Sequence, residues 1–162
     1  MLLTLHKAKL HRATALFLCA AFVALSGCAP RSVGGGGQTS QLDNQIGAAI
    51  GDPSTCVLLA ERKTGRVIYR YGDEANCDRQ LPACDRPGTL NAKTAFQFAA
   101  VGRMASCPSS PDGSRMVGWA EGSVQSQKKA DLVYSAVMEG QRALPGHEIN
   151  ARLFDAFAAA GV

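Results

Sequence analysis

The chain has little of the residue types that most metal sites require. Its 162 residues include three histidines, and His6 and His11 both lie within the first 27 residues. Only His147 remains beyond this leader, and a lone histidine cannot build a histidine-rich metal site. We therefore expect no metal and no cofactor, and interpret His147 as a solvated residue near the start of a helix.

The net positive charge is also small once the leader is left out of the count. The leader holds three of the 17 Lys and Arg residues and none of the 13 Asp and Glu residues, so residues 28–162 carry a net charge of +1. This balance leaves no basic patch, and we expect no nucleic-acid partner. The apolar run that begins at residue 13 is short of the ~20 residues that span a bilayer, which argues against a transmembrane anchor.

The leader nevertheless carries a specific pattern. A basic segment precedes the apolar run, and the sequence Leu-Ser-Gly then stands directly before Cys28. This order is typical of an export signal, and residues 25–28 resemble the lipobox of bacterial lipoproteins. The resemblance implies that residues 1–27 are removed and that Cys28 carries lipid. The absence of Asp after Cys28 favours, by the same resemblance, the outer membrane over the inner one, with the protein facing the periplasm. An alternative is an ordinary cleaved signal in which Cys28 is incidental.

The rest of the chain divides into two parts. Residues 28–39 include four consecutive glycines and no core-forming pattern, which predicts a flexible tether behind the lipidated cysteine. Residues 40–162 are enough for one small domain with a single core.

Four cysteines lie within this domain, and an even number in an oxidising compartment predicts two disulfides. They are Cys56, Cys77, Cys84 and Cys107. Their spacing contains no Cys-x-x-Cys and fits no zinc ribbon. Three pairings are open. A local bridge between Cys77 and Cys84 would close a short polar loop and would leave Cys56 with Cys107.

The apolar pattern predicts an α+β domain, with terminal helices packed on an antiparallel sheet in the order α-β-β-α-β-β-α. The expected helices cover residues 40–50, 91–105 and about 149–160, and the expected strands cover 56–61, 66–71, 115–124 and 132–138. The first two strands form a hairpin. The single tryptophan, Trp119, lies in the third strand between two glycines, where core packing is favoured over a ligand-stacking role.

Three stretches of the domain carry a family resemblance. Residues 57–71 form the expected hairpin, residues 81–84 read Leu-Pro-Ala-Cys, and residues 112–122 lead into a strand. Together they resemble the α/β half of penicillin-binding proteins and serine β-lactamases, in which the second stretch holds a Pro-Ala-Ser nucleophile segment. The resemblance implies a shortened relative and, as its activity, a serine-hydrolase reaction on β-lactams or peptidoglycan peptides.

The departures from that family concern its catalytic residues. Pro87 stands where the family places the lysine of Ser-x-x-Lys, Ser-x-Asn is absent, and residues 93–95 read Lys-Thr-Ala rather than Lys-Thr-Gly. A literal Ser-x-x-Lys occurs at Ser126 and Lys129, in a polar turn without the family's helix. Cys84 as nucleophile would need a base. Ser126, Lys129 and Cys84 are therefore the weak catalytic candidates.

These observations favour a cell-envelope lipoprotein with a non-catalytic binding or accessory domain. Its expected partners are the membrane, through lipid on Cys28, and an envelope protein or peptidoglycan. The alternatives are the serine-hydrolase-type enzyme and a roadblock- or profilin-like binding module, which has a similar order of elements. Fold order alone does not decide among them.

Overall fold

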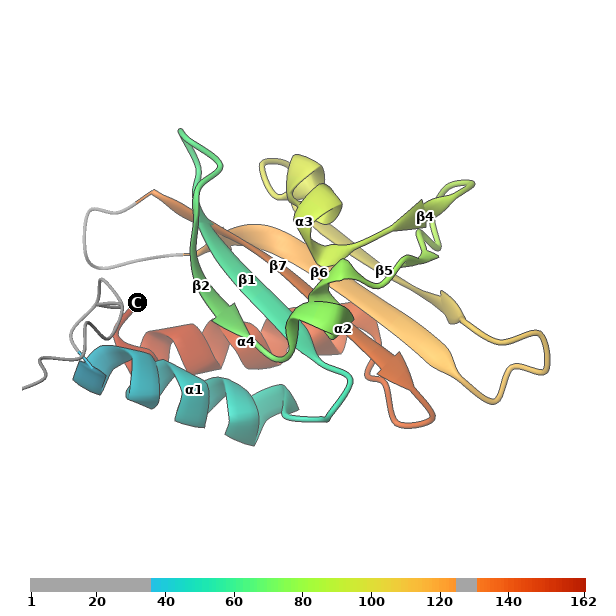
Figure 1. The fold of residues 1–162 in the computed structure, drawn as a ribbon, viewed down its shortest axis with the longest axis horizontal. Coiled ribbons are helices and arrows are strands. Elements are labelled where there is room, and N and C mark those ends of the chain that lie inside the picture. Colours follow the sequence, from blue (N-terminus) through green and yellow to red (C-terminus); the bar gives the residue numbers. More distant parts are fainter. Residues whose placement is uncertain (1–35, 125–130) are drawn as a thin grey trace, which may run out of the picture. The chain divides into compact units, whose positions relative to one another are not determined.

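Five antiparallel strands form the central sheet of the residues that the computed structural model describes, 36–124 and 131–162, in the order β2-β1-β7-β6-β5 (Figure 1). Their bounds are Cys56–Glu61 for β1, Val67–Tyr71 for β2, Arg103–Pro108 for β5, Met116–Val124 for β6 and Leu132–Gly140 for β7. The α+β class expected from the sequence is confirmed.

The hairpin of β1 and β2 is confirmed. Strand β1 is apolar and buried along almost its full length because it pairs with β2 on one side and with β7 on the other. The turn between β1 and β2 contains Gly65 at φ 67°, a left-handed conformation that glycine adopts without steric cost. Strand β2 is an edge strand, and its side chains are mostly exposed.

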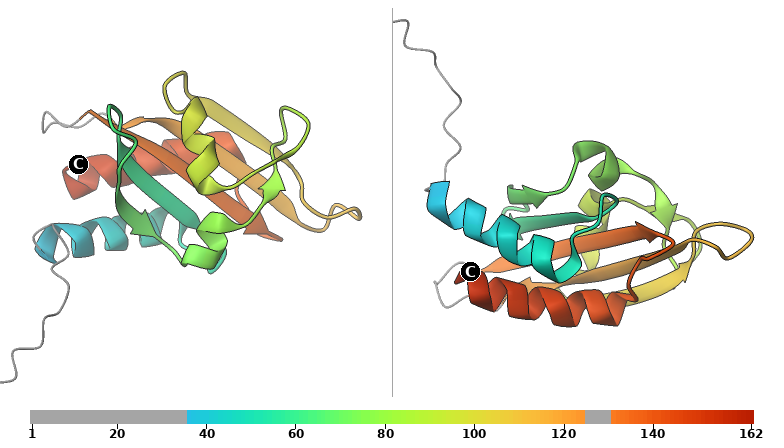
Figure 2. Two further views of the ribbon diagram at one scale, coloured as in Figure 1. Left: turned by 45° about the horizontal axis from the view of Figure 1, so that its top comes forward. Right: turned by 90° about the horizontal axis from the view of Figure 1, so that it is seen from below.

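Two long helices, α1 (Gly36–Ile50) and α4 (Gly146–Ala160), cover one face of the sheet and pack side by side (Figure 2). The apolar residues on their inner faces, among them Ile46 and Leu153, are buried against β1, β6 and β7. Helix α1 begins four residues before the expected start at residue 40, so the end of the expected tether is helical. No helix in the described ranges has the length and apolar character needed to cross a membrane.

Short elements cover the opposite face. They are α2 (Glu74–Asp78), β3 (Leu81–Pro82), β4 (Thr89–Leu90), α3 (Ala92–Ala95) and the 3₁₀ helix η1 (Phe96–Phe98). The core beneath them is built around Trp119, which is fully buried and donates a hydrogen bond from Nε1 to the carbonyl of Pro82 at 2.8 Å. The expectation that Trp119 packs in the core is confirmed.

The prediction of a helix over residues 91–105 is wrong. Asn91 does cap a helix, with its side chain accepting from the Thr94 N–H at 2.8 Å, but α3 and η1 end by residue 98. The chain then turns at Gly102, in a left-handed conformation, and enters β5. Residues 103–108 form a ladder of hydrogen bonds with β6 instead of helical hydrogen bonds. The sheet therefore has a fifth strand, β5, which the sequence pattern did not predict.

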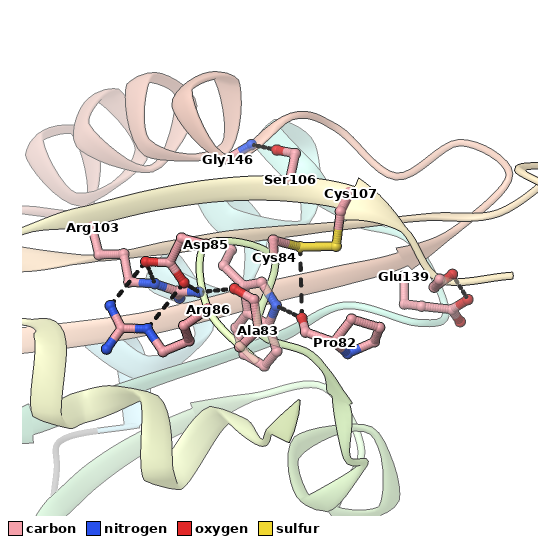
Figure 3. Close-up of a disulfide and its surroundings, with 12 residues drawn as sticks. Pro82, Ala83, Cys84, Asp85, Arg86, Arg103, Ser106, Cys107, Glu139 and Gly146 are labelled. Atoms are coloured by element: carbon pink, nitrogen blue, oxygen red, sulfur yellow. Dashed lines mark hydrogen bonds and ion pairs between the residues drawn. A yellow bond between two sulfur atoms is a disulfide. The ribbon is translucent and has the colours of Figure 1, made fainter. Parts of the chain in front are cut away.

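The local pairing of Cys77 with Cys84 is also wrong. The disulfides join Cys56 to Cys77 and Cys84 to Cys107. Cys77 on α2 lies directly over β1, so it meets Cys56 at the start of that strand. Cys84 lies over the sheet edge, where it meets Cys107 of the unpredicted strand β5 (Figure 3).

Candidate functional site

Two polar centres lie on the sheet face that the short elements cover. The Arg103 centre contains Arg103, Glu121 and Asp85, and the Glu139 centre contains Glu139, Arg79, Arg115 and Ser109. Side chains alternate between the two faces of a strand. Glu121 therefore shares a face with Trp119 on β6, and Glu139 shares it with Val137 on β7. Each carboxylate continues a buried apolar row.

Arg103 is saturated by acceptors. It stands directly opposite Glu121 in the β5–β6 ladder, and its Nη1 lies 3.1 Å from both carboxylate oxygens. Its Nε and Nη2 donate to Asp85 at 3.1 and 2.9 Å, and Nη2 also donates to the Ala83 carbonyl (Figure 3). The guanidinium thus ties the loop of residues 83–88 to the sheet and leaves no hydrogen-bonding edge for a ligand.

The two carboxylates of this centre share one buried cation, and their pKa values move in opposite directions. Hydrogen bonds from Arg86 and Arg103 hold the pKa of Asp85 well below its usual range. Burial raises the pKa of Glu121 to about 7 in spite of Arg103, because Glu121 is only 1% exposed. The charge of Asp85 is thereby retained at the surface, and Glu121 titrates near neutral pH.

Ser135 extends the Arg103 centre to the next strand. It faces Glu121 in the β6–β7 ladder and is fully buried, and its Oγ has no hydrogen-bond partner among the residues that the structure describes. Because this buried hydroxyl makes no hydrogen bond to Glu121 or to any other described base, it is a packing element rather than a nucleophile.

Cys84 is not available as a nucleophile, because its sulfur is bonded to Cys107. It is also the single non-glycine residue with a positive φ, 71°, in the described part of the chain. His147 does not serve it as a base. That histidine is exposed in the first turn of α4, which covers the other face of the sheet. The expectation of a solvated His147 near a helix start is confirmed.

Glu139 receives donors from three residues. Arg115 donates from Nε and Nη2 at 2.8 and 2.6 Å, Arg79 donates from Nη1 at 2.9 Å, and the Ser109 hydroxyl donates at 2.7 Å. These bonds, led by Arg115, lower the pKa of Glu139 to about 2. The carboxylate is buried, yet Arg79 and Arg115 keep 44% and 46% of their side-chain surface exposed. Glu139 therefore fixes two guanidinium groups whose outer edges face solvent.

An open hollow of about 420 Å³ lies over the Glu139 centre. Its charged lining residues are Arg79, Arg115, Arg142, Glu139 and Asp52. Arg142 contacts Asp52 at 3.2 Å and is 85% exposed. Three guanidinium groups thus meet two carboxylates, and the excess positive charge and unengaged N–H groups suit an anionic ligand, above all a planar carboxylate.

The remaining candidates from the sequence are not brought together. Ser126, Lys129 and Cys28 lie outside the described residues. Lys93, of the Lys-Thr-Ala segment, is exposed and pairs with Asp78 at 2.8 Å, and Pro87 is exposed in its loop.

Sequence reasoning missed the charged residues of both centres. A signal for two of them was present, because Glu121 and Glu139 each interrupt an otherwise apolar strand. The arginines that pair with them had no such signal, since Arg103 begins β5, Arg115 directly precedes β6 and Arg79 follows α2 in a loop.

No group of three His, Cys, Asp or Glu side chains within the described ranges could hold a metal ion. Comparison with known proteins gives no guide to function: no family model, no curated protein and no solved structure matches the chain significantly.

Proposed function

We propose that this protein is a lipoprotein of the bacterial cell envelope whose domain binds a carboxylate-bearing ligand and has no serine-hydrolase activity. The observation that carries the proposal is the hollow in which buried Glu139 holds Arg79 and Arg115 with their outer edges exposed. The export pattern that ends at Cys28 supports the location.

The segment that resembles a nucleophile site has no residues arranged for hydrolysis. Its cysteine, Cys84, is in a disulfide, and Arg103, which donates to the neighbouring Ala83 carbonyl, is occupied by two carboxylates and that carbonyl. An arginine remains protonated at any physiological pH, so it cannot act as the base that a serine hydrolase needs. This arrangement supports a binding domain rather than a serine hydrolase.

The ligand class follows from the donor set. A guanidinium group recognises a carboxylate through two parallel hydrogen bonds, and pre-organisation of the group by Glu139 reduces the entropy lost on binding. Peptidoglycan peptides expose free carboxylates on the side of the membrane that the leader predicts. We therefore favour a cell-wall peptide as the ligand over an acidic envelope protein.

The test is titration of the purified protein with carboxylated cell-wall peptides and with the same peptides amidated. We expect binding of the carboxylated form alone, with affinity reduced at least tenfold by Arg142→Ala and by Arg79→Ala. Arg152→Ala is the matched control, because it removes one partly exposed arginine from the opposite sheet face. Equal binding of amidated peptides, or no binding of either form, would overturn the proposal.

A fluorescent penicillin tests the enzymatic alternative directly. The wild-type protein should form no covalent adduct. An adduct that is lost in Ser126→Ala or in Cys84→Ala would identify a nucleophile and replace the binding domain with a serine-hydrolase-type enzyme.

A further inference from the structure

The two disulfides differ in their surroundings. Cys56 and Cys77 are fully buried in the core around Trp119. Cys84 and Cys107 are only partly buried and lie at the edge of the sheet, where β5 has no partner strand on its outer side. An external thiol can therefore approach the second bond, whereas the first is shielded by packed side chains.

The backbone at Cys84 adds a second difference. A side chain with a Cβ is strained in the left-handed conformation that Cys84 adopts at φ 71°. Cys56 has no such conformation, because it lies in regular β1. Opening the bond to Cys107 removes one of the constraints that hold this conformation, so strain release favours reduction of this pair.

The loop of residues 83–88 does not depend on the disulfide alone. Arg103 donates to the Ala83 carbonyl and to Asp85, and the Ala83 N–H donates to Gly88 at 3.1 Å. These bonds keep the loop over β5 after the sulfur–sulfur bond opens. The two thiols consequently stay close enough to re-form the bond.

We propose that Cys84–Cys107 is a reversible thiol–disulfide exchange site whose substrate is a dithiol, and that Cys56–Cys77 is a structural bond. A thiolate of the dithiol attacks one sulfur and forms a mixed disulfide, while the other cysteine leaves as a thiolate. The second thiol of the donor then attacks the mixed disulfide. The donor is oxidised to its disulfide, and Cys84 and Cys107 gain two electrons and two protons.

Trp119 provides a built-in reporter of this reaction. It is the one tryptophan of the chain, and its indole N–H is bonded to Pro82, two residues before Cys84. The indole packs in the same core as Cys84 and Cys107, so opening their bond should change its surroundings, and with them the indole fluorescence, while the loop stays in place.

The experiment treats the oxidised full-length protein with graded dithiothreitol, traps free thiols with N-ethylmaleimide and identifies the labelled peptides by mass spectrometry. We expect Cys84 and Cys107 to be labelled at least tenfold faster than Cys56 and Cys77, with a parallel change in Trp119 fluorescence. In a parallel reduced sample that is freed of dithiothreitol and not yet trapped, oxidised glutathione should restore the original fluorescence and then protect Cys84 and Cys107 from labelling. Peptides that contain Cys19 or Cys28 are quantified separately.

A variant carrying both Cys84→Ser and Cys107→Ser is the matched control, and it should show no fluorescence response to mild reductant. Equal labelling rates for the two pairs, labelling only in denaturant, or failure of the bond to re-form would each overturn the proposal.

Discussion

Glu121 and Glu139 are buried carboxylates on the same face of one sheet, yet their pKa values are shifted in opposite directions. Glu121 shares a single guanidinium with Asp85, and burial raises its pKa to about 7. Glu139 has two arginines and a serine hydroxyl to itself, and its pKa falls to about 2. Desolvation is the larger effect at Glu121 and the arginine hydrogen bonds are the larger effect at Glu139, so the balance of depth of burial and number of donors decides which form the fold stabilises.

The two centres also differ in role: one stabilises the fold, and the other can bind a ligand. The cation at Glu121 is buried with all its edges in use, so that centre stabilises the loop above β5. The cations at Glu139 are half-exposed, so the same type of ion pair presents donors to solvent. Only the second arrangement is suited to a ligand.

The largest expected effect comes from removing the cation that Glu121 and Asp85 share. Arg103→Met leaves a buried carboxylate without a partner and should lower the free energy of unfolding by about 3–5 kcal/mol at pH 8. Urea denaturation measures the loss. Combining Arg103→Met with Glu121→Gln should recover part of the stability, because no buried carboxylate is then left without a cation. A loss below about 1 kcal/mol in the single variant would mean that Arg103 does not hold Glu121.

The pH dependence of stability should differ in sign between the two glutamates. The folded state keeps the Glu121 proton between the ordinary value of 4.5 and about 7, whereas the unfolded chain has lost it. Stability therefore falls as pH rises through this window, by up to roughly 3 kcal/mol, and Glu121→Gln should remove the decline.

Glu139→Gln is the matched control for that pH profile. The lowered pKa of Glu139 stabilises the fold above 4.5, and this contribution is lost as pH falls towards about 2. The Glu139→Gln variant should accordingly keep the decline between pH 5 and 7 and lose the acid-range slope. Urea unfolding across pH measures both profiles, and an unchanged neutral slope in Glu121→Gln would contradict the assignment.

The smallest effect is expected at Ser135, beside Glu121. Its buried hydroxyl has no partner among the described residues, so Ser135→Ala removes an unsatisfied polar group and should raise stability by about 1 kcal/mol. Thermal unfolding at fixed pH detects the change. A loss of stability instead would show that the hydroxyl makes a bond to water or to Glu121.

Much of the fold was predictable because its signals are local. The hairpin of residues 56–71 and the strands ending near residues 124 and 138 follow from apolar patterning and from Gly65 in its turn. Strand β5 was not predictable, because its residues carry no strong alternation and follow an Ala-rich stretch that favours helix. Its conformation is decided by the free edge of β6.

The candidate site was less predictable than the fold. An acid within an apolar strand indicates that something unusual is buried there, and Glu121 and Glu139 both carry that signal. The arginines that pair with these two acids could not be identified from the sequence. Arg103 and Arg115 contact these acids from other strands or loops. The residues next to each arginine do not indicate which acid it will lie opposite in the folded sheet.

The amino-acid sequence by itself determined the leader pattern at Cys28, the α+β class, the terminal helices and an even set of cysteines in the domain. Each depends on composition or on spacing within a short segment. The tertiary structure alone decided that Cys84 joins Cys107, that β5 completes the sheet, and that one glutamate faces one shared cation while the other faces two. These outcomes depend on segments distant in sequence meeting at the sheet, where packing and charge pairing select among alternatives that are locally equivalent.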